Sequence, residues 1–154
     1  MRKILQHLSG FSLVMMVVLV IYDASMRYLF SAGSTALQEL QWHFFDAVIL
    51  LSIAYTLQHN AHVRVDIFYD RFSPRTKQLI DIITLVFFII PFSLFIIYTS
   101  YDFVLLSFTQ NEASSDPGGL PYRWIVKSLI IIAFVGVIFE AATQLYTKGK
   151  QWLR

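Results

Sequence analysis

The sequence has 154 residues, of which 56% are hydrophobic and only 14% are charged. Soluble domains keep about a quarter of their residues charged, so this balance excludes an ordinary soluble domain and indicates that lipid is the solvent. The net charge of +2 is too small to indicate a nucleic-acid partner. The lack of cysteine excludes disulfides, thiolate metal sites and thiol catalysis.

Four apolar stretches are long enough to cross a bilayer, which takes about 20 mostly apolar residues. We expect these spans at 8–29, 36–57, 79–106 and 124–146. The first follows Arg2 and Lys3 as in a secretory signal peptide, but no A-x-A-like cleavage site follows, so we interpret it as a retained span. None of the stretches shows the two-residue alternation of a membrane barrel. The predicted fold is a single all-α domain, 1–154, an integral membrane four-helix bundle.

The first two spans form a predicted hairpin with charged side chains at matching depths. Its turn lies near Gly33, so residues equally far from that turn along the chain should lie opposite one another. This count pairs Arg27 with Glu39, near the outer surface, and Asp23 with His43. Charges in hydrocarbon are unfavourable by at least a few kcal/mol each, so such partners are expected.

Asp46 shares one helix face with the preceding polar residues of the second span, but the same count offers it only Val20. We expect Asp46, and Glu140 in the last span, to meet polar groups of another chain. In the second hairpin the count pairs Asp102 with Lys127. Two interpretations stay open for these charged residues. They are either pairs that hold the bundle together or an ion or proton path, for which intramembrane carboxylates are typical.

The connection after the second span is predicted to contain a short amphipathic helix at the inner membrane surface. Its apolar residues recur at i, i+3, i+4 and i+7, which is one stripe of a helix. Its arginines can reach anionic headgroups, each contact contributing about 1 kcal/mol. The alternative is an ordinary connector with a few apolar residues. The candidate interfacial motif comprises His62, Arg64, Asp66 and Arg71.

Three further features concern the second half of the chain. Ser73-Pro74 is expected to open the third helix, because proline suits a first helical turn. Pro91 is expected to kink that helix, because it lacks a backbone N–H. The connection before the last span contains Asp116-Pro117-Gly118-Gly119, which favours a turn.

Lys and Arg residues are distributed unequally between the two sides of the predicted bundle. Nine of the twelve lie in the N-terminal tail, the connection after the second span and the C-terminal tail, and three lie at the other connections. The positive-inside rule therefore places both termini in the cytoplasm.

No motif for catalysis or cofactor binding is found: there is no nucleophile elbow, phosphate loop, zinc-helix motif or dinucleotide fingerprint. A membrane cytochrome needs two histidines on facing helices, and only His43 lies well inside a span. His59 and His62 are three residues apart but lack further ligands nearby. We therefore expect no enzymatic activity, no metal and no cofactor.

Glu39-Leu40 opens the second span, and His62-Val63-Arg64-Val65-Asp66 follows it. Asp116-Pro117-Gly118-Gly119-Leu120-Pro121-Tyr122-Arg123-Trp124 leads into the last span. These segments, the length and the four-span plan resemble the DctQ-like small membrane subunit of tripartite ATP-independent periplasmic (TRAP) transporters over nearly the whole chain. One departure concerns the cytoplasmic end of the second span. The family often has a basic residue there, whereas this chain has Gln58 and His59, which weakens any inference of charge contacts at that point.

The resemblance implies a non-catalytic subunit of the bacterial inner membrane that scaffolds a large multi-span transport subunit. In such systems a periplasmic substrate-binding protein captures an organic acid, and a sodium gradient typically drives uptake. The resemblance also implies that Asp46 and Glu140 brace the subunit interface. The outer loop, with Asp116 and Arg123, is then expected to help dock the periplasmic protein.

Two rival functions stay open. The first is a small self-assembling exporter with a carboxylate in its pore, although Asp23 beside Arg27 would be neutralised. The second is a haem- or quinone-binding membrane anchor of a redox enzyme, which a visible absorption spectrum would reveal.

Overall fold

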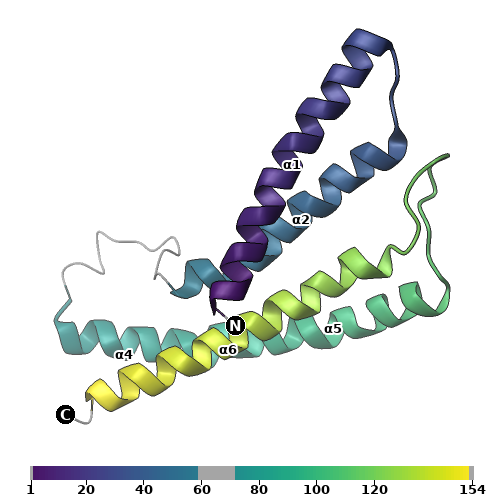
Figure 1. Cartoon of the computed structure of the whole chain (residues 1–154). Coiled ribbons are helices and arrows are strands. Elements are labelled where there is room, and N and C mark those ends of the chain that lie inside the picture. Colours follow the sequence, from purple (N-terminus) through teal and green to yellow (C-terminus); the bar gives the residue numbers. More distant parts are fainter. Residues whose placement is uncertain (1, 59–71, 153–154) are drawn as a thin grey trace.

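The computed structural model of this chain describes residues 2–58 and 72–152, and within them every regular element is helical (Figure 1). The elements are α1 (Arg2–Phe30), α2 (Thr35–Gln58), α4 (Pro74–Thr84), the π-helical segment η1 (Leu85–Ile89), α5 (Ile90–Thr109) and α6 (Trp124–Trp152). Four helical stretches are long and apolar enough to cross a membrane, with α4, η1 and α5 forming one of them. The prediction of an all-α protein with four spans is confirmed.

The helices form two hairpins that meet through α6. α1 packs against α2, α5 packs against α6, and α2 joins the two hairpins by packing against α6. Figure 1 shows that the C-terminal end of α1 stands well away from α5 and α6, so the two hairpins diverge toward that end. α6 is therefore the central helix, with α2 and α5 on two of its sides.

Small residues allow α2 and α6 to approach closely. Ala54, Ala133 and Ala141 are buried, and Gly136 lies where a Cβ atom would be 3.0 Å from Cδ1 of Leu5 and 3.5 Å from the Cβ of Ala54. Small side chains at helix contacts are typical of membrane bundles, since lipid tails are as apolar as leucine and association relies on close packing. Most large apolar side chains instead face outward.

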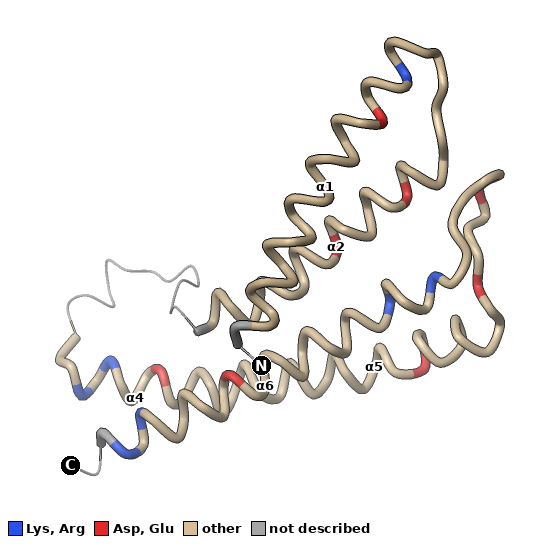
Figure 2. The backbone as a smooth tube through the Cα atoms, viewed as in Figure 1, with Lys and Arg blue, Asp and Glu red and all other residues tan. Residues whose placement is uncertain are grey.

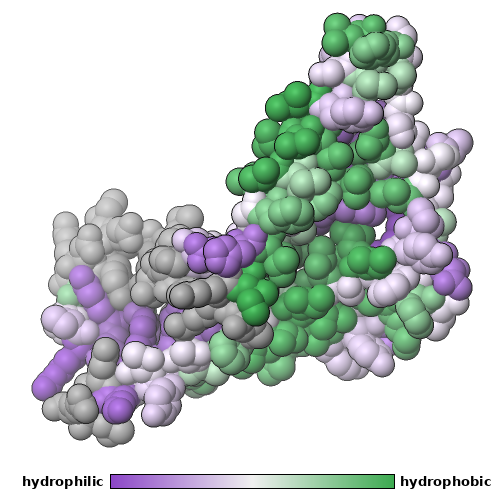
Figure 3. Space-filling view, viewed as in Figure 1, coloured by the Kyte–Doolittle hydropathy of each residue, from purple (hydrophilic) through white to green (hydrophobic). Residues whose placement is uncertain are grey.

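The distribution of charge and hydropathy follows the long axes of the helices. Lys and Arg residues gather where α4 begins and α6 ends, and again where α6 begins (Figure 2). The middle and the top of the visible face are broadly hydrophobic, and hydrophilic residues gather at the lower left and along the right edge of the view (Figure 3). This pattern is what a multi-pass membrane protein requires, because charged groups are costly in hydrocarbon.

The third span begins as the sequence predicts and is irregular near its proline. Ser73 caps α4, where its hydroxyl accepts the N–H of Thr76 at 3.3 Å, and Pro74 occupies the first turn. Just before Pro91 the backbone widens into the π-helical segment η1. A proline ring clashes with the carbonyl four residues earlier in a regular α-helix, and a wider turn relieves that clash. The disturbance expected at Pro91 thus takes the form of a π turn.

The predicted amphipathic helix of the connecting segment lies outside the residues that the structure describes. The same holds for its candidate interfacial motif and for one further histidine. These residues are His59, His62, Arg64, Asp66 and Arg71.

Candidate functional site

A polar groove of about 260 Å³ lies between α2 and the beginning of α6. Three of its charged or polar side chains come from the stripe predicted on the second span. One cation comes from the residue just before α6 and another from the first turn of α6. The residues that line it are Glu39, Trp42, His43, Asp46, Arg123, Val126 and Lys127. The fold therefore brings together five residues that the sequence singles out separately.

Glu39 fastens the outer loop, residues 110–123, to α2. Its buried carboxylate accepts hydrogen bonds from the Ser114 hydroxyl and from the backbone N–H of Leu120, the latter at 2.6 Å. The guanidinium of Arg123 lies 3.4 Å from the same carboxylate. A carboxylate with several donors is well compensated for leaving water. Glu39 thus joins α2, the outer loop and the start of α6.

This contact corrects the predicted pairing of Arg27 with Glu39. Arg27 instead forms an ion pair with Asp23, one turn earlier on α1. Residues four apart on a helix are neighbours, so this pair needs no particular packing between helices. The other oxygen of Asp23, Oδ1, is buried and has no hydrogen-bond partner among the described residues. His43, the predicted partner of Asp23, lines the polar groove beside Asp46.

The tight turn predicted in the outer loop is confirmed. The N–H of Gly119 donates to the carbonyl of Asp116 at 3.0 Å, and Gly118 has a φ of +77°, which suits glycine. A Cβ at Gly119 would lie 2.4 Å from the Cβ of Ser114 and 2.9 Å from the carboxylate of Glu39. Only glycine lets the loop come this close to α2.

Lys127 has a partner other than the one predicted. The sequence pairs it with Asp102, but Asp102 lies exposed on α5, and the Lys127 ammonium donates to Glu112 of the outer loop. The ammonium also lies 4.0 Å from the ring centroid of Phe103. The hydrogen bond from Lys127, with a smaller effect of Ser107, holds the pKa of Glu112 below its ordinary value. Glu112 is a second anchor of the loop that sequence reasoning missed.

The two residues predicted at a subunit interface have different surroundings. Asp46 is half-buried, lines the polar groove and forms no ion pair within the part of the chain that the structure describes. Glu140 is only 2% exposed, and its carboxylate accepts a hydrogen bond from Gln144 at 3.3 Å. Glu140 is therefore packed inside this chain, whereas Asp46 faces an open groove.

Trp42 is the residue of this region that sequence reasoning missed most plainly. It lines the polar groove and also a second groove of about 460 Å³ on the α1 side, together with Arg27 and Phe45. Its side chain is 65% exposed and meets the ring of Phe45 edge to face. An exposed tryptophan between two grooves is typical of a contact surface. The sequence places Trp42 next to His43 of the polar stripe, and this position could have indicated its part in the groove.

At the opposite end of the bundle, polar side chains join α6 to two other helices. Lys148 of α6 forms an ion pair with Asp81 of α4. Gln144 donates to the carbonyl of Leu57 at 2.7 Å, where α2 ends. These contacts fasten α6 to both neighbouring helices.

Comparison with known proteins places the chain in a family. Residues 16–150 match the family described as the DctQ component of tripartite ATP-independent periplasmic transporters. A protein of Haemophilus influenzae with the provisional name TRAP transporter small permease protein is 28% identical over 133 residues, which cover 86% of this chain and 75% of that protein. With its four helices of membrane-crossing length, the chain belongs to the DctQ family, the small membrane subunits of TRAP transporters.

Proposed function

We propose that this subunit is a non-catalytic scaffold for the large multi-span transport subunit of its transporter. The observation that supports the proposal most directly is the surroundings of Asp46. This half-buried carboxylate faces a groove beside the exposed Trp42 and forms no ion pair within the described residues. Carboxylates inside spans face partners or water, and tryptophan is enriched at the centres of protein interfaces. A polar group of the large subunit would complete this site.

The other charged residues support a structural role over a transport path. Glu39 and Lys127 are bound to the outer loop, and Lys148 is bound to Asp81 at the far end. Secondary transporters usually show paired interrupted helices in repeated halves. Here the described irregularity is the single π segment before Pro91. We therefore assign substrate and ion binding to other subunits, in a system that imports an organic acid with sodium.

We further propose that the protein lies in the bacterial inner membrane with both termini in the cytoplasm, as the distribution of Lys and Arg favours. The outer loop then faces the periplasm and helps to dock the substrate-binding protein. Glu39 and Lys127 fix the loop in place, while Asp116 and Tyr122 stay exposed on it. Arg123 is directed toward Glu39, so Asp116 is the better candidate for direct contact.

The test is to tag the chain, extract it from its native membrane in mild detergent and identify the proteins that come with it. Recovery of a large polytopic membrane protein in roughly equal amount would support the scaffold proposal. Recovery of the chain alone, or only with itself, would contradict it and favour an exporter. A coloured preparation would favour the redox anchor. Uptake by the recovered complex in vesicles, with and without a sodium gradient, then tests the coupling.

A further inference from the structure

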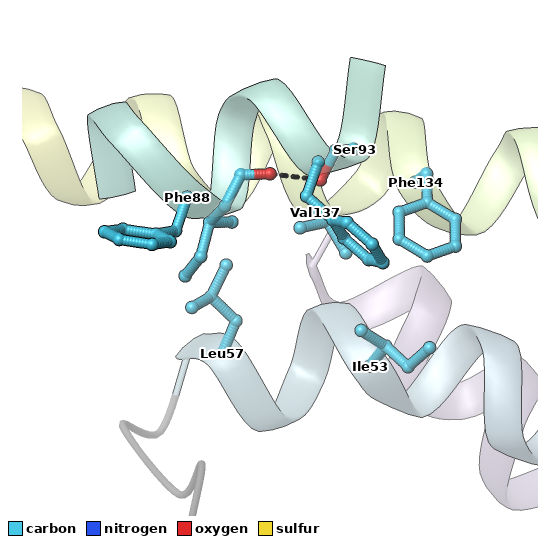
Figure 4. A pocket seen from close by; sticks show the side chains of 8 residues that line it. Ile53, Leu57, Phe88, Ser93, Phe134 and Val137 are labelled. Carbon is cyan, nitrogen blue, oxygen red and sulfur yellow. Dashed lines mark hydrogen bonds between the residues drawn. The ribbon is translucent and has the colours of Figure 1, made fainter. Parts of the chain in front are cut away.

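An apolar groove of about 440 Å³ lies between α2 and the third span, with α6 as its floor (Figure 4). Its lining comes from the end of α2, from η1 and the start of α5, and from the middle of α6. The lining residues are Ile53, Leu57, Phe88, Ile89, Phe92, Ser93, Phe134 and Val137. We call this feature the apolar groove.

The apolar groove offers no polar group to an occupant. Ser93 is its only hydroxyl, is 1% exposed and donates its hydrogen bond to the carbonyl of Ile89 at 2.6 Å (Figure 4). Phe88 and Phe92 form an exposed rim, since both rings stay largely accessible. A wholly apolar surface at membrane depth gains nothing from water, so its occupant must itself be apolar.

The size of the apolar groove favours a slender occupant. A helix with its side chains is about 10–12 Å across, so a volume of about 440 Å³ holds about one helical turn at most. A hydrocarbon chain is thinner and can bend to follow the wall. The lipids around a membrane-spanning helix supply such hydrocarbon chains.

A basic cluster lies one leaflet away from the apolar groove. Three turns of α6 separate Val137 in the groove from Lys148, a rise of about 16 Å. Half of the hydrocarbon core is about 15 Å, so Lys148 falls at headgroup level when the groove lies near the bilayer centre. The described residues here carry four cations and one carboxylate; α4 supplies two of the cations and the carboxylate, and α6 supplies the other two cations. They are Arg75, Lys77, Asp81, Lys148 and Lys150.

From this geometry we infer that the apolar groove binds one acyl chain of an anionic phospholipid whose headgroup lies at the basic cluster of α4 and α6. The apolar wall selects the chain, and the excess of positive charge selects the headgroup. The distance along α6 between the apolar groove and the basic cluster matches the hydrocarbon thickness of one leaflet. Such a lipid would fill the space between α2 and the third span, and would thereby join the two hairpins.

Photolabelling tests the inference. The tagged chain, with any subunits that it retains, is reconstituted into phosphatidylethanolamine vesicles that contain phosphatidylglycerol with a diazirine at the end of one acyl chain. After irradiation, the labelled peptides are mapped by mass spectrometry. We expect labels to concentrate around Ile53, Phe88 and Phe92. A phosphatidylcholine probe with the same diazirine should label these positions several-fold less.

Two matched pairs of variants locate the acyl chain. Ile53→Phe narrows the groove, whereas Ile49→Phe makes the same change one turn away at an exposed position that does not line it. Phe88→Ala removes part of the rim, whereas Phe87→Ala removes an equally exposed neighbour outside the groove. We expect the first member of each pair to lower labelling several-fold and the second to leave it unchanged. Phe88 and Phe87 are both exposed, so neither alanine substitution removes a buried side chain.

A second set of variants locates the headgroup. Arg75→Gln and Lys150→Gln change exposed residues of the basic cluster, and each should lower the phosphatidylglycerol labelling about fivefold. Labels spread evenly over all spans, or equal labelling within both matched pairs, would show only surrounding bulk lipid and overturn the inference. Labels absent from the groove when a second subunit is present would show that protein covers it, and would also overturn the inference.

Discussion

Arg123, the last residue before α6, lies 3.4 Å from the carboxylate of Glu39 on α2, although 84 residues separate them in the chain. The same carboxylate accepts the N–H of Leu120 and the hydroxyl of Ser114. One side chain near the start of α2 therefore fastens the outer loop at three points, in addition to the anchor at Glu112. The shape of that loop depends on how the two hairpins pack together.

Glu39→Gln should loosen the outer loop while leaving the helices in place. The amide has one acceptor oxygen in place of two and no charge, so it cannot serve Ser114, Leu120 and Arg123 together. We expect faster hydrogen exchange at the amides of Ser114 and Leu120, measured by mass spectrometry in detergent. Asp102→Asn changes an exposed carboxylate on α5 and is the matched control. Unchanged exchange at Leu120 in Glu39→Gln would contradict the fastening role.

Glu112 should make the stability of the outer loop depend on pH. The hydrogen bond from Lys127 lowers the pKa of Glu112 below its ordinary value of 4.5. A folded-state pKa below the unfolded one stabilises the fold fully above about pH 4.5, and this stabilisation is lost as the pH falls through the folded pKa. The thermal midpoint of Glu112→Gln should therefore lie below that of the wild type at pH 7, and the difference should vanish in acid.

Lys127→Gln tests the same pH dependence from the other side of the ion pair. It removes the cation that lowers the pKa of Glu112, so its thermal midpoint should lose the part of the acid dependence that Glu112 contributes to the wild type. A difference between wild type and Glu112→Gln that stays constant from pH 7 down to acid would argue against the ion pair as its cause.

Local sequence patterns were enough to predict the helices and the turn, but the partners of the charged residues depend on packing. Span length, Ser73-Pro74 and the turn at Asp116 depend on neighbours in the chain, and the structure agrees with each. Pairing residues that lie equally far from the hairpin turn assumes that each charged side chain meets one on the facing helix. Arg27 had a closer partner on its own helix, and Glu39 found donors on a distant loop. The i, i+4 spacing of the first pair was visible in the sequence.

Gly136 should tolerate alanine but not leucine. A Cβ there would lie 3.0 Å from the end of the Leu5 side chain, which can shift, and alanine gains about 1 kcal/mol of helix propensity. A larger side chain would force α6 away from α1 and α2, and overpacking of this kind typically costs about 1–3 kcal/mol. Thermal unfolding in detergent compares the variants. Gly149→Leu is the control, because a Cβ at Gly149 meets nothing within 4 Å.

Gln144→Leu should weaken the contact between α6 and the end of α2. The variant leaves the carbonyl of Leu57 without the donor that now lies at 2.7 Å. Hydrogen bonds between membrane helices contribute about 0.6 kcal/mol on average and up to about 1.7 kcal/mol. Thr143→Val is the matched control, since the Thr143 hydroxyl donates only to Phe139 of its own helix. Equal unfolding midpoints for the two variants would count against a role of Gln144 between helices.

Asp46→Leu should impair assembly with the large subunit while leaving the isolated chain at least as stable as before. The substitution removes a half-buried charge that has no ion pair within the described residues, and the relief of its burial offsets the loss of its electrostatic interaction with His43. A donor on the large subunit would lose its acceptor, and hydrogen bonds to charged groups contribute about 1.5–3 kcal/mol, a tenfold or greater loss of affinity. The measurement is the amount of large subunit recovered with the tagged chain, beside the thermal midpoint of the chain itself. Asp46→Asn keeps the shape and should retain more of the large subunit than leucine, while Asp102→Asn should behave as the wild type. If all three variants recover the large subunit equally, Asp46 does not contact it, and the exposed Trp42 becomes the residue to change next.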